Sequence, residues 1–118
     1  MISLKYIEII RKSCDKLKQD RFAVFVVGDV RDKTGFYYDF ISDTKQAFIN
    51  SGLKLYNELI LVEMVGNLAM RVGRYMNGSR KVGKQHQNVL VFYKGNPKNI
   101  KQNYPELDLS YIKDQIEE

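Results

Sequence analysis

The sequence predicts an α/β fold with three strands and two main helices, and three observations lead to it. Two segments place apolar residues at helical spacing, three are apolar runs of strand length, and the two kinds are interspersed along the chain. Because a helix joins the first two predicted strands, we expect those strands to be parallel and the last strand to be antiparallel. The 118 residues form one domain at most.

The first predicted helix covers residues 2–18, where apolar and charged side chains separate onto two faces. Residues 22–27 follow as an uninterrupted run of β-branched and aromatic residues, which is too short for a helix. Such a run is typical of a strand that is buried on both faces, in a sheet covered by helices on both sides.

The second helix is predicted over residues 36–50, with Phe36 on its apolar face and a serine–glycine pair ending it. Residues 53–65 indicate a second strand, which has more polar side chains than the first and lies at a sheet edge or has a bend. Residues 88–94 indicate the third strand. Residues 66–88, interrupted by glycine and asparagine, are expected to form a long connection without regular structure. Such a connection inside a compact domain is usually functional or disordered.

These elements occupy residues 1–101, and residues 102–118 form a polar tail for which one weak helix is an interpretation. Three strands make about half of a doubly wound sheet, which usually has five or more. Because the chain opens directly into a helix, we expect the missing strands to lie on the N-terminal side, before Met1.

Positive charge is concentrated in one part of the chain. Residues 64–105 hold eight Lys and Arg side chains and no Asp or Glu. The other residues hold 11 basic and 14 acidic side chains, so their net charge is −3 in a chain of net charge +5. Such one-sided positive fields are typical of surfaces that bind polyanions, and a merely solvated basic face is the alternative. We therefore expect DNA or another nucleic acid as a partner.

Composition excludes several classes of protein. No run of 18 apolar residues is present, so a membrane-spanning helix is excluded, and charges in the first 14 residues argue against a secretory signal. Cys14 is the single cysteine and can form neither an intramolecular disulfide nor a metal site by itself, which fits a reducing cytoplasm. Its place on the apolar face of the first helix favours a core role over that of a nucleophile.

The element order and several stretches of sequence resemble the C-terminal part of phage and bacterial S-adenosylmethionine-dependent DNA methyltransferases, which modify the amino group of adenine (N6) or cytosine (N4). The resemblance covers roughly residues 5–101. Its most specific stretch is residues 79–95, SRKVGKQHQNVLVFYKG, and it includes residues 21–29, RFAVFVVGD, and 52–58, GLKLYNE. The fold that it implies is a partial Rossmann-like methyltransferase sheet.

Two motifs of that family are absent from this sequence. Such enzymes have a glycine-rich F-x-G-x-G turn at the cofactor and a D/N-P-P-Y/F/W loop that binds the flipped target base. Gly28-Asp29 has no second glycine at the required spacing, and Pro97 and Pro105 stand in other contexts. The resemblance thus implies S-adenosylmethionine in the complete enzyme, but neither tight cofactor binding nor a catalytic residue in this chain alone.

Two groups of residues are candidates for ligand binding. In the family, the loop between the last two strands faces the DNA near the target base, and exposed cations on such a loop suit phosphate contacts. The candidates there are Arg71, Arg74, Arg80, Lys81, Lys84 and His86. The alternatives are a solvated loop without a ligand and, for the single histidine, a structural hydrogen bond.

The second group is Asp29, Arg31 and Asp32, which follow the carboxyl end of the first strand. Ligands collect at that edge of open α/β sheets, although a loop salt bridge or a turn explains these residues equally well. The neighbouring Tyr37 and Tyr38 are of a type that stacks on bases.

Three hypotheses follow for the function. The chain is the C-terminal part of a DNA amino-methyltransferase that is inactive by itself, or a free-standing basic module that binds nucleic acid without catalysis. In the third hypothesis, it completes a sheet with a partner subunit or a second copy, because the open strand edge of a half sheet is a liability unless it is covered.

Overall fold

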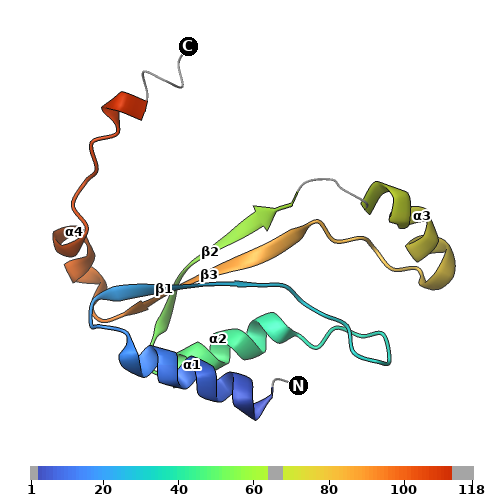
Figure 1. Cartoon of the computed structure of the whole chain (residues 1–118), viewed down its shortest axis with the longest axis horizontal. Coiled ribbons are helices and arrows are strands. Elements are labelled where there is room, and N and C mark those ends of the chain that lie inside the picture. The colour runs from blue at the N-terminus through green and yellow to red at the C-terminus, as the bar shows by residue number, and fades with distance from the viewer. Residues whose placement is uncertain (1–2, 64–67, 113–118) are drawn as a thin grey trace.

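A three-stranded sheet with two helices against one face forms the body of the chain (Figure 1). This computed structural model describes residues 3–63 and 68–112. The elements are α1 (Leu4–Lys16), β1 (Arg21–Val27), α2 (Phe40–Asn50), β2 (Lys54–Val62), α3 (Leu68–Ser79), β3 (His86–Lys94), η1 (Pro97–Asn99) and α4 (Ile100–Asn103). The helices α1 and α2 lie side by side under the sheet, and α3 lies beyond one end of it.

The strand order is β1-β3-β2, and both strand pairings are antiparallel. The prediction that the first two strands form a parallel part of the sheet is therefore wrong, because β3 lies between them and pairs with both. The physical reason is that a helical connection does not have to place the next strand directly beside the previous one. It can leave one strand position in the sheet open between them. The chain after β2 then fills that position with an antiparallel strand.

Capping groups fix both ends of α1. Ser3 Oγ accepts a hydrogen bond from the amide of Tyr6 at 3.2 Å, which satisfies one of the free N–H groups of the first turn. At the other end, Lys94 Nζ donates to the carbonyl oxygens of Cys14 and Leu17 at 2.7 and 2.8 Å. A cation from β3 therefore neutralises the partly negative C-terminus of α1 and ties the helix to the sheet.

The second helix begins later than residue 36, where the periodicity placed its start. Asp39 has a φ angle of 57°, and α2 starts at Phe40. Residues 31 and 37 instead form an isolated antiparallel bridge, so the chain between β1 and α2 makes a hairpin. Phe36 is consequently exposed on that hairpin and does not pack on the apolar face of α2.

The core lies between α1, α2 and the facing side of the sheet. Phe48 of α2 stacks on Phe92 of β3 with ring centroids 4.2 Å apart, and it meets Phe25 of β1 edge-to-face at 5.4 Å. The buried members of this cluster are Ile10, Cys14, Val27, Ala47, Phe48, Leu53, Leu90 and Phe92. Cys14 is thus a core residue, as predicted, and burial raises the pKa of its thiol.

The opposite face of the sheet carries apolar side chains that no helix of the described residues covers. Val24 and Val26 of β1 are 61% and 49% exposed, and Leu59 of β2 is 53% exposed. The strand register places them on one face, because Val26 and Leu59 both lie opposite Val89 of β3. The prediction that the first strand is buried on both faces is therefore wrong for the part of the chain that the structure describes.

The connection between β2 and β3 contains regular structure that the sequence did not indicate. Residues 68–79 form α3, so the expectation of a structureless segment is wrong there, and residues 64–67 lie outside the described residues. After β3, the short helix α4 is followed by Tyr104, which packs on Phe22 with ring centroids 5.3 Å apart. Within residues 3–63 and 68–112, no helix has the length and apolar character needed to cross a membrane.

Candidate nucleic-acid interface

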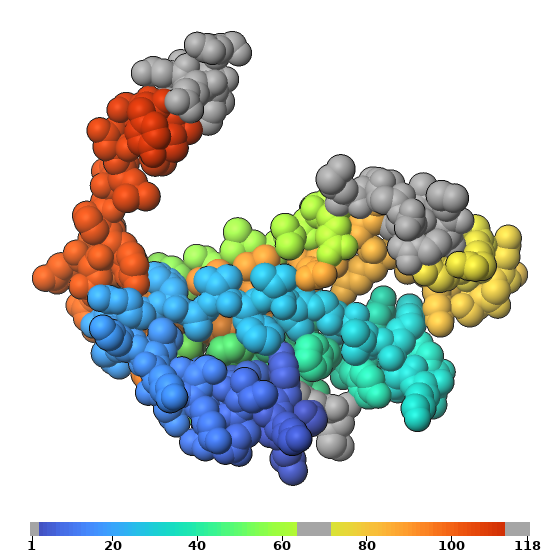
Figure 2. All heavy atoms as spheres, viewed as in Figure 1, coloured from blue at the N-terminus to red at the C-terminus, as the bar shows by residue number. Residues whose placement is uncertain are grey.

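The two groups of candidate residues meet at one end of the sheet. Val27, the last residue of β1, pairs with Asn88 near the start of β3. The residues that follow β1 therefore lie beside the residues that precede β3, although more than 40 positions separate them. Figure 2 shows the hairpin after β1 and the segment after α3 next to each other at this end of the molecule.

A hollow of about 350 Å³ lies between these two segments. Asp29, Arg31 and Tyr37 line it from the hairpin side, and Lys81 and Lys84 line it from the other side. Three cations and one carboxylate thus face a space large enough for part of a nucleotide. A hollow with an excess of positive charge is suited to a phosphate group.

A second hollow, also of about 350 Å³, adjoins the first and shares Asp29 and Lys84 with it. Glu63, His86 and Gln87 complete its polar lining. His86 is the exposed first residue of β3 and lies opposite Val62 in the strand register. Glu63 accepts a hydrogen bond from Gln87 Nε2 at 2.6 Å. No local pattern in the chain points to Glu63, because its place here depends on the register between β2 and β3.

Asp29 has a structural partner as well as a place in both hollows. Its carboxylate accepts a hydrogen bond from the amide of Ile41, in the first turn of α2, at 3.3 Å. Asp39, the residue at the N-cap position of α2, makes no side-chain capping bond. Asp29 therefore replaces the missing cap from 12 residues away, and the positive end of the α2 dipole offsets its negative charge.

Asp32 stabilises the turn of the hairpin. Its carboxylate accepts hydrogen bonds from Thr34, through both the hydroxyl and the amide, and from the amide of Phe36 at 3.1 Å. The hydrogen bond from the Thr34 hydroxyl, helped by these backbone bonds, lowers the pKa of Asp32. Of the roles considered for Asp32, which were ligand binding, a loop salt bridge and a turn, the hydrogen bonds favour the turn.

Arg31 is the member of its group that faces the hollow with a positive charge. Its Nη1 donates to the carbonyl oxygen of Gly35 at 2.7 Å, and its guanidinium carbon lies 4.2 Å from the centre of the Tyr37 ring. The Nζ of Lys84 lies 6.0 Å from the same ring centre. The Tyr37 ring and the Gly35 carbonyl hold the Arg31 side chain in place. A guanidinium has five N–H donors, so donors that do not bond to Gly35 can bind an anion.

The remaining candidates are spread along α3 and the segment after it. Arg74 is exposed on α3, and the side chain of Arg71 lies outside the described part of the structure. Arg80 has a φ angle of 58°, and its Nη1 donates to the carbonyl oxygens of Met76 and Asn77. Arg80 therefore caps the C-terminus of α3, and Lys81 and Lys84 are the residues of this group that line the hollow.

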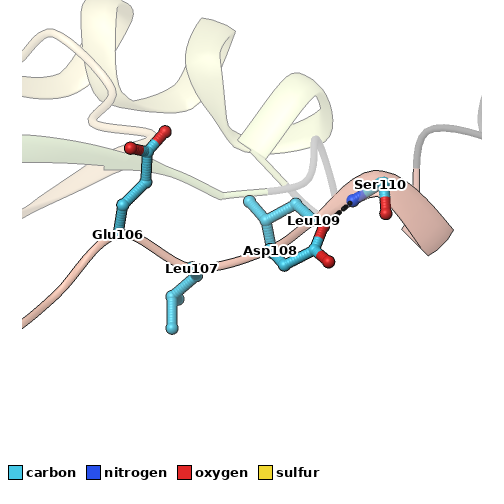
Figure 3. Close-up of a pocket in the computed structure, with 5 residues that line it drawn as sticks. All are labelled: Glu106, Leu107, Asp108, Leu109 and Ser110. Carbon is cyan, nitrogen blue, oxygen red and sulfur yellow. Dashed lines mark hydrogen bonds between the residues drawn. The ribbon is translucent and has the colours of Figure 1, made fainter.

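Two other places in the molecule carry no comparable arrangement. A hollow of about 570 Å³ beside the tail is lined by consecutive residues 106–110 of one extended segment (Figure 3). The side chains of that segment do not converge from different elements, so they form no site. Among residues 3–63 and 68–112, no three His, Cys, Asp or Glu side chains lie together as metal ligands.

Comparison with known proteins identifies the fold. No family model matches the chain, and no curated protein matches it. Among solved structures, it is similar to a protein from Thermus thermophilus described as a DNA modification methylase, with a TM-score of 0.59 and 16% sequence identity. The match covers 91% of this chain and 44% of that protein, so the chain spans less than half of its length. The chain therefore shares its fold with a part of that protein.

Proposed function

We propose that this chain is the C-terminal, target-facing portion of an S-adenosylmethionine-dependent DNA methyltransferase that modifies an exocyclic base amine of adenine or cytosine. In this proposal the chain contributes DNA contacts and does not catalyse methyl transfer by itself. The observation that carries the proposal is the convergence of Arg31, Lys81 and Lys84 around one hollow, at one end of a sheet with a methylase-like fold.

The turn after β1 offers no close backbone approach for the cofactor. Gly28 follows β1, where a glycine-rich turn would bring backbone amides close to a ligand. A Cβ atom added at Gly28 would meet side-chain atoms of Gln87 and Lys84 at 3.8 and 3.9 Å, which is ordinary contact. The turn therefore has no space that a ligand could fill only because position 28 lacks a Cβ atom. We expect S-adenosylmethionine to bind the complete enzyme, through residues outside this chain, and we place that enzyme in a reducing cytoplasm.

A second candidate function is that of a sheet-completing subunit in a split enzyme, and the uncovered apolar face of the sheet favours it. Val24, Val26 and Leu59 stay in contact with water unless a partner subunit or a second copy covers them. A monodisperse monomer in sedimentation velocity would count against this candidate.

The binding of a labelled DNA duplex, measured by fluorescence anisotropy over a series of salt concentrations, tests the DNA contact. Each phosphate that a cation neutralises contributes about 0.9 to the slope of log affinity against log salt. Replacing Lys81 and Lys84 by glutamine should therefore lower that slope by about 2 and weaken binding at low salt. Calorimetry with S-adenosylmethionine should detect no tight binding to the chain alone.

A charge-matched control separates contact at this site from the effect of net charge. Lys16 and Lys18 are exposed at the C-terminal end of α1 and just after it. This end of α1 lies away from α3 and from the hairpin after β1 (Figure 1). Replacing both by glutamine removes the same two charges and should leave the slope nearly unchanged. Equal slopes for the two double variants, or no DNA binding at low salt, would overturn the proposal. Methyl transfer by the chain alone would overturn its non-catalytic part.

A further inference from the structure

The second half of β2 is an exposed apolar edge of the sheet. β2 is the last strand in the order β1-β3-β2, and among the described residues it pairs with β3 alone (Figure 1). Four consecutive apolar residues there are between 46% and 74% exposed, namely Leu59, Ile60, Leu61 and Val62. Successive side chains of a strand point to opposite faces, so apolar groups contact water on both faces of this edge.

The features that usually protect a free edge are missing from this run. Charged residues, proline and bulges are the common means by which proteins prevent an edge strand from pairing with another chain. Residues 59–62 include neither a charged residue nor a proline. The register shift of β2 lies nearer its other end, between Leu55 and Asn57. This part of β2 is therefore suited to pairing with a further strand.

The backbone groups that are available for such pairing follow from the hydrogen bonds to the β3 side. The amide of Glu63 donates to the carbonyl oxygen of Gln85 at 2.8 Å, so the backbone groups of Glu63 face that side. In an antiparallel pair, the N–H and C=O groups of successive residues point alternately to the two sides of the strand. Those of Glu58, Ile60 and Val62 therefore point outward and can bond to another strand.

The apolar run of β2 is complementary to its own copy. Two copies of β2 can run antiparallel about a twofold axis at Ile60, an arrangement in which the same surface of each chain forms the interface. The two Ile60 side chains then lie opposite each other on one face. Leu59 of each copy lies opposite Leu61 of the other on the second face. Apolar pairs of this kind are the contacts that stabilise adjacent strands.

The polar residues that flank the run fit the same register. Asn57 of each copy lies opposite Glu63 of the other, and its side-chain amide can donate to that carboxylate. Glu58 lies opposite Val62, so the two copies of Glu58 do not meet. An axis at Glu58 would instead place two carboxylates directly opposite each other, which is unfavourable. Both the apolar pattern and the charges of β2 thus favour a second copy, with the axis at Ile60.

We propose that two copies of this chain associate through β2, antiparallel about Ile60, so that their two sheets become one continuous sheet. The partner that this edge fits is a second copy of the chain. The inference goes beyond the proposed function and is independent of it, because it does not involve the hollow that Lys81 and Lys84 line.

Sedimentation velocity tests the association, and we expect the wild-type chain to form dimers. Ile60→Lys should raise the dissociation constant of the dimer by at least about tenfold, because it removes an apolar contact and places two ammonium groups opposite each other at the axis. Val24→Lys is the matched control, since Val24 is exposed to a similar extent but lies on β1. It should leave the dissociation constant nearly unchanged.

Disulfide cross-linking tests the register. In the proposed dimer the Cα atoms of the two Ile60 residues are about 5.5 Å apart, a separation that a disulfide can span. The two Val62 residues are offset by four positions, or about 13 Å along the strands. Under mild oxidation Ile60→Cys should give a disulfide-linked dimer and Val62→Cys should not, although Val62 is the more exposed residue. The wild-type chain gives the background, because Cys14 is buried.

A monomeric wild-type chain would overturn the inference and leave the DNA contact of Lys81 and Lys84 intact. A dimer that persists in Ile60→Lys, or one that Val24→Lys dissociates to the same extent, would also overturn it. Cross-linking of Val62→Cys as fast as that of Ile60→Cys would refute the register. Dimers that bind no DNA at low salt would overturn the proposed function and leave this inference standing.

Discussion

Asp29 offers a test in which a structural role and a ligand-binding role predict opposite results. Its carboxylate replaces the missing cap of α2 through the bond to Ile41, and it is also the one carboxylate among the cations of the first hollow. Loss of an N-cap side chain costs about 0.5–2 kcal/mol. At 3.3 Å the bond is long, so we expect Asp29→Ala to lower the free energy of unfolding by about 0.5–1 kcal/mol.

The same substitution removes a negative charge beside Arg31 and Lys84. DNA should therefore bind Asp29→Ala more tightly than the wild-type chain, by a few fold at low salt, because repulsion between the carboxylate and the phosphates is lost. Asp29→Asn keeps an oxygen acceptor for the amide of Ile41 and loses the charge. It should recover most of the stability and show the same gain in affinity.

Urea denaturation followed by circular dichroism gives the stability, and fluorescence anisotropy gives the affinity. Asp32→Asn is the comparison variant, because Asp32 carries the same charge on the same hairpin and bonds only within the turn. If Asp29→Ala weakened DNA binding and left the urea midpoint unchanged, Asp29 would be a ligand for the DNA, and its assignment as the cap of α2 would be wrong.

Three further predictions concern the body of the fold. Phe92→Ala should lower the free energy of unfolding in urea by about 3–5 kcal/mol, because the fully buried ring stacks on Phe48 and leaves a cavity. Gly95→Ala should cost about 1–3 kcal/mol in the same assay, since Gly95 has a φ of 135° and a Cβ there would lie 2.5 Å from Asp20 Oδ1. Burial, together with the hydrogen bond to Asp20, raises the pKa of Tyr93 from 10.0 to about 12. Between these two pH values the folded chain keeps the Tyr93 proton, whereas the unfolded chain releases it. The contribution of Tyr93 to the free energy of unfolding is therefore complete below pH 10 and is lost as the pH rises toward 12. The urea midpoint should fall more between pH 9 and pH 11 in the wild-type chain than in Tyr93→Phe.

The strands and main helices could be predicted from the sequence because each has a local cause. The apolar run at residues 22–27 and the run at 88–94 correspond to β1 and β3, and the helical spacing at residues 2–18 corresponds to α1. The second strand, for which a sheet edge or a bend was predicted, is an edge strand and has a register shift between Leu55 and Asn57. Such patterns reflect which side chains can face a core, and that requirement acts over a few residues at a time.

Helix α3 and the hairpin after β1 were missed for opposite reasons. In α3, Gly73 and Gly78 are poor helix formers, so the intrinsic propensity indicated a loop where the structure has a helix. In the hairpin, Phe36 fitted the helical spacing of α2, but the bonds of the Asp32 carboxylate close a turn there. A side chain that bonds to nearby backbone can override periodicity, and the pattern of apolar residues carries no information about it.

By itself the sequence determined the three strands and the two main helices, the location of the basic segment and the core role of Cys14. Only the tertiary structure decided that β3 lies between β1 and β2. This strand order places Arg31, Lys81 and Lys84 around the same hollow. It also assigned Asp29 to the start of α2 and Arg80 to the end of α3. The physical reason is that strand order and register are set by long-range pairing and burial, which involve residues far apart along the chain.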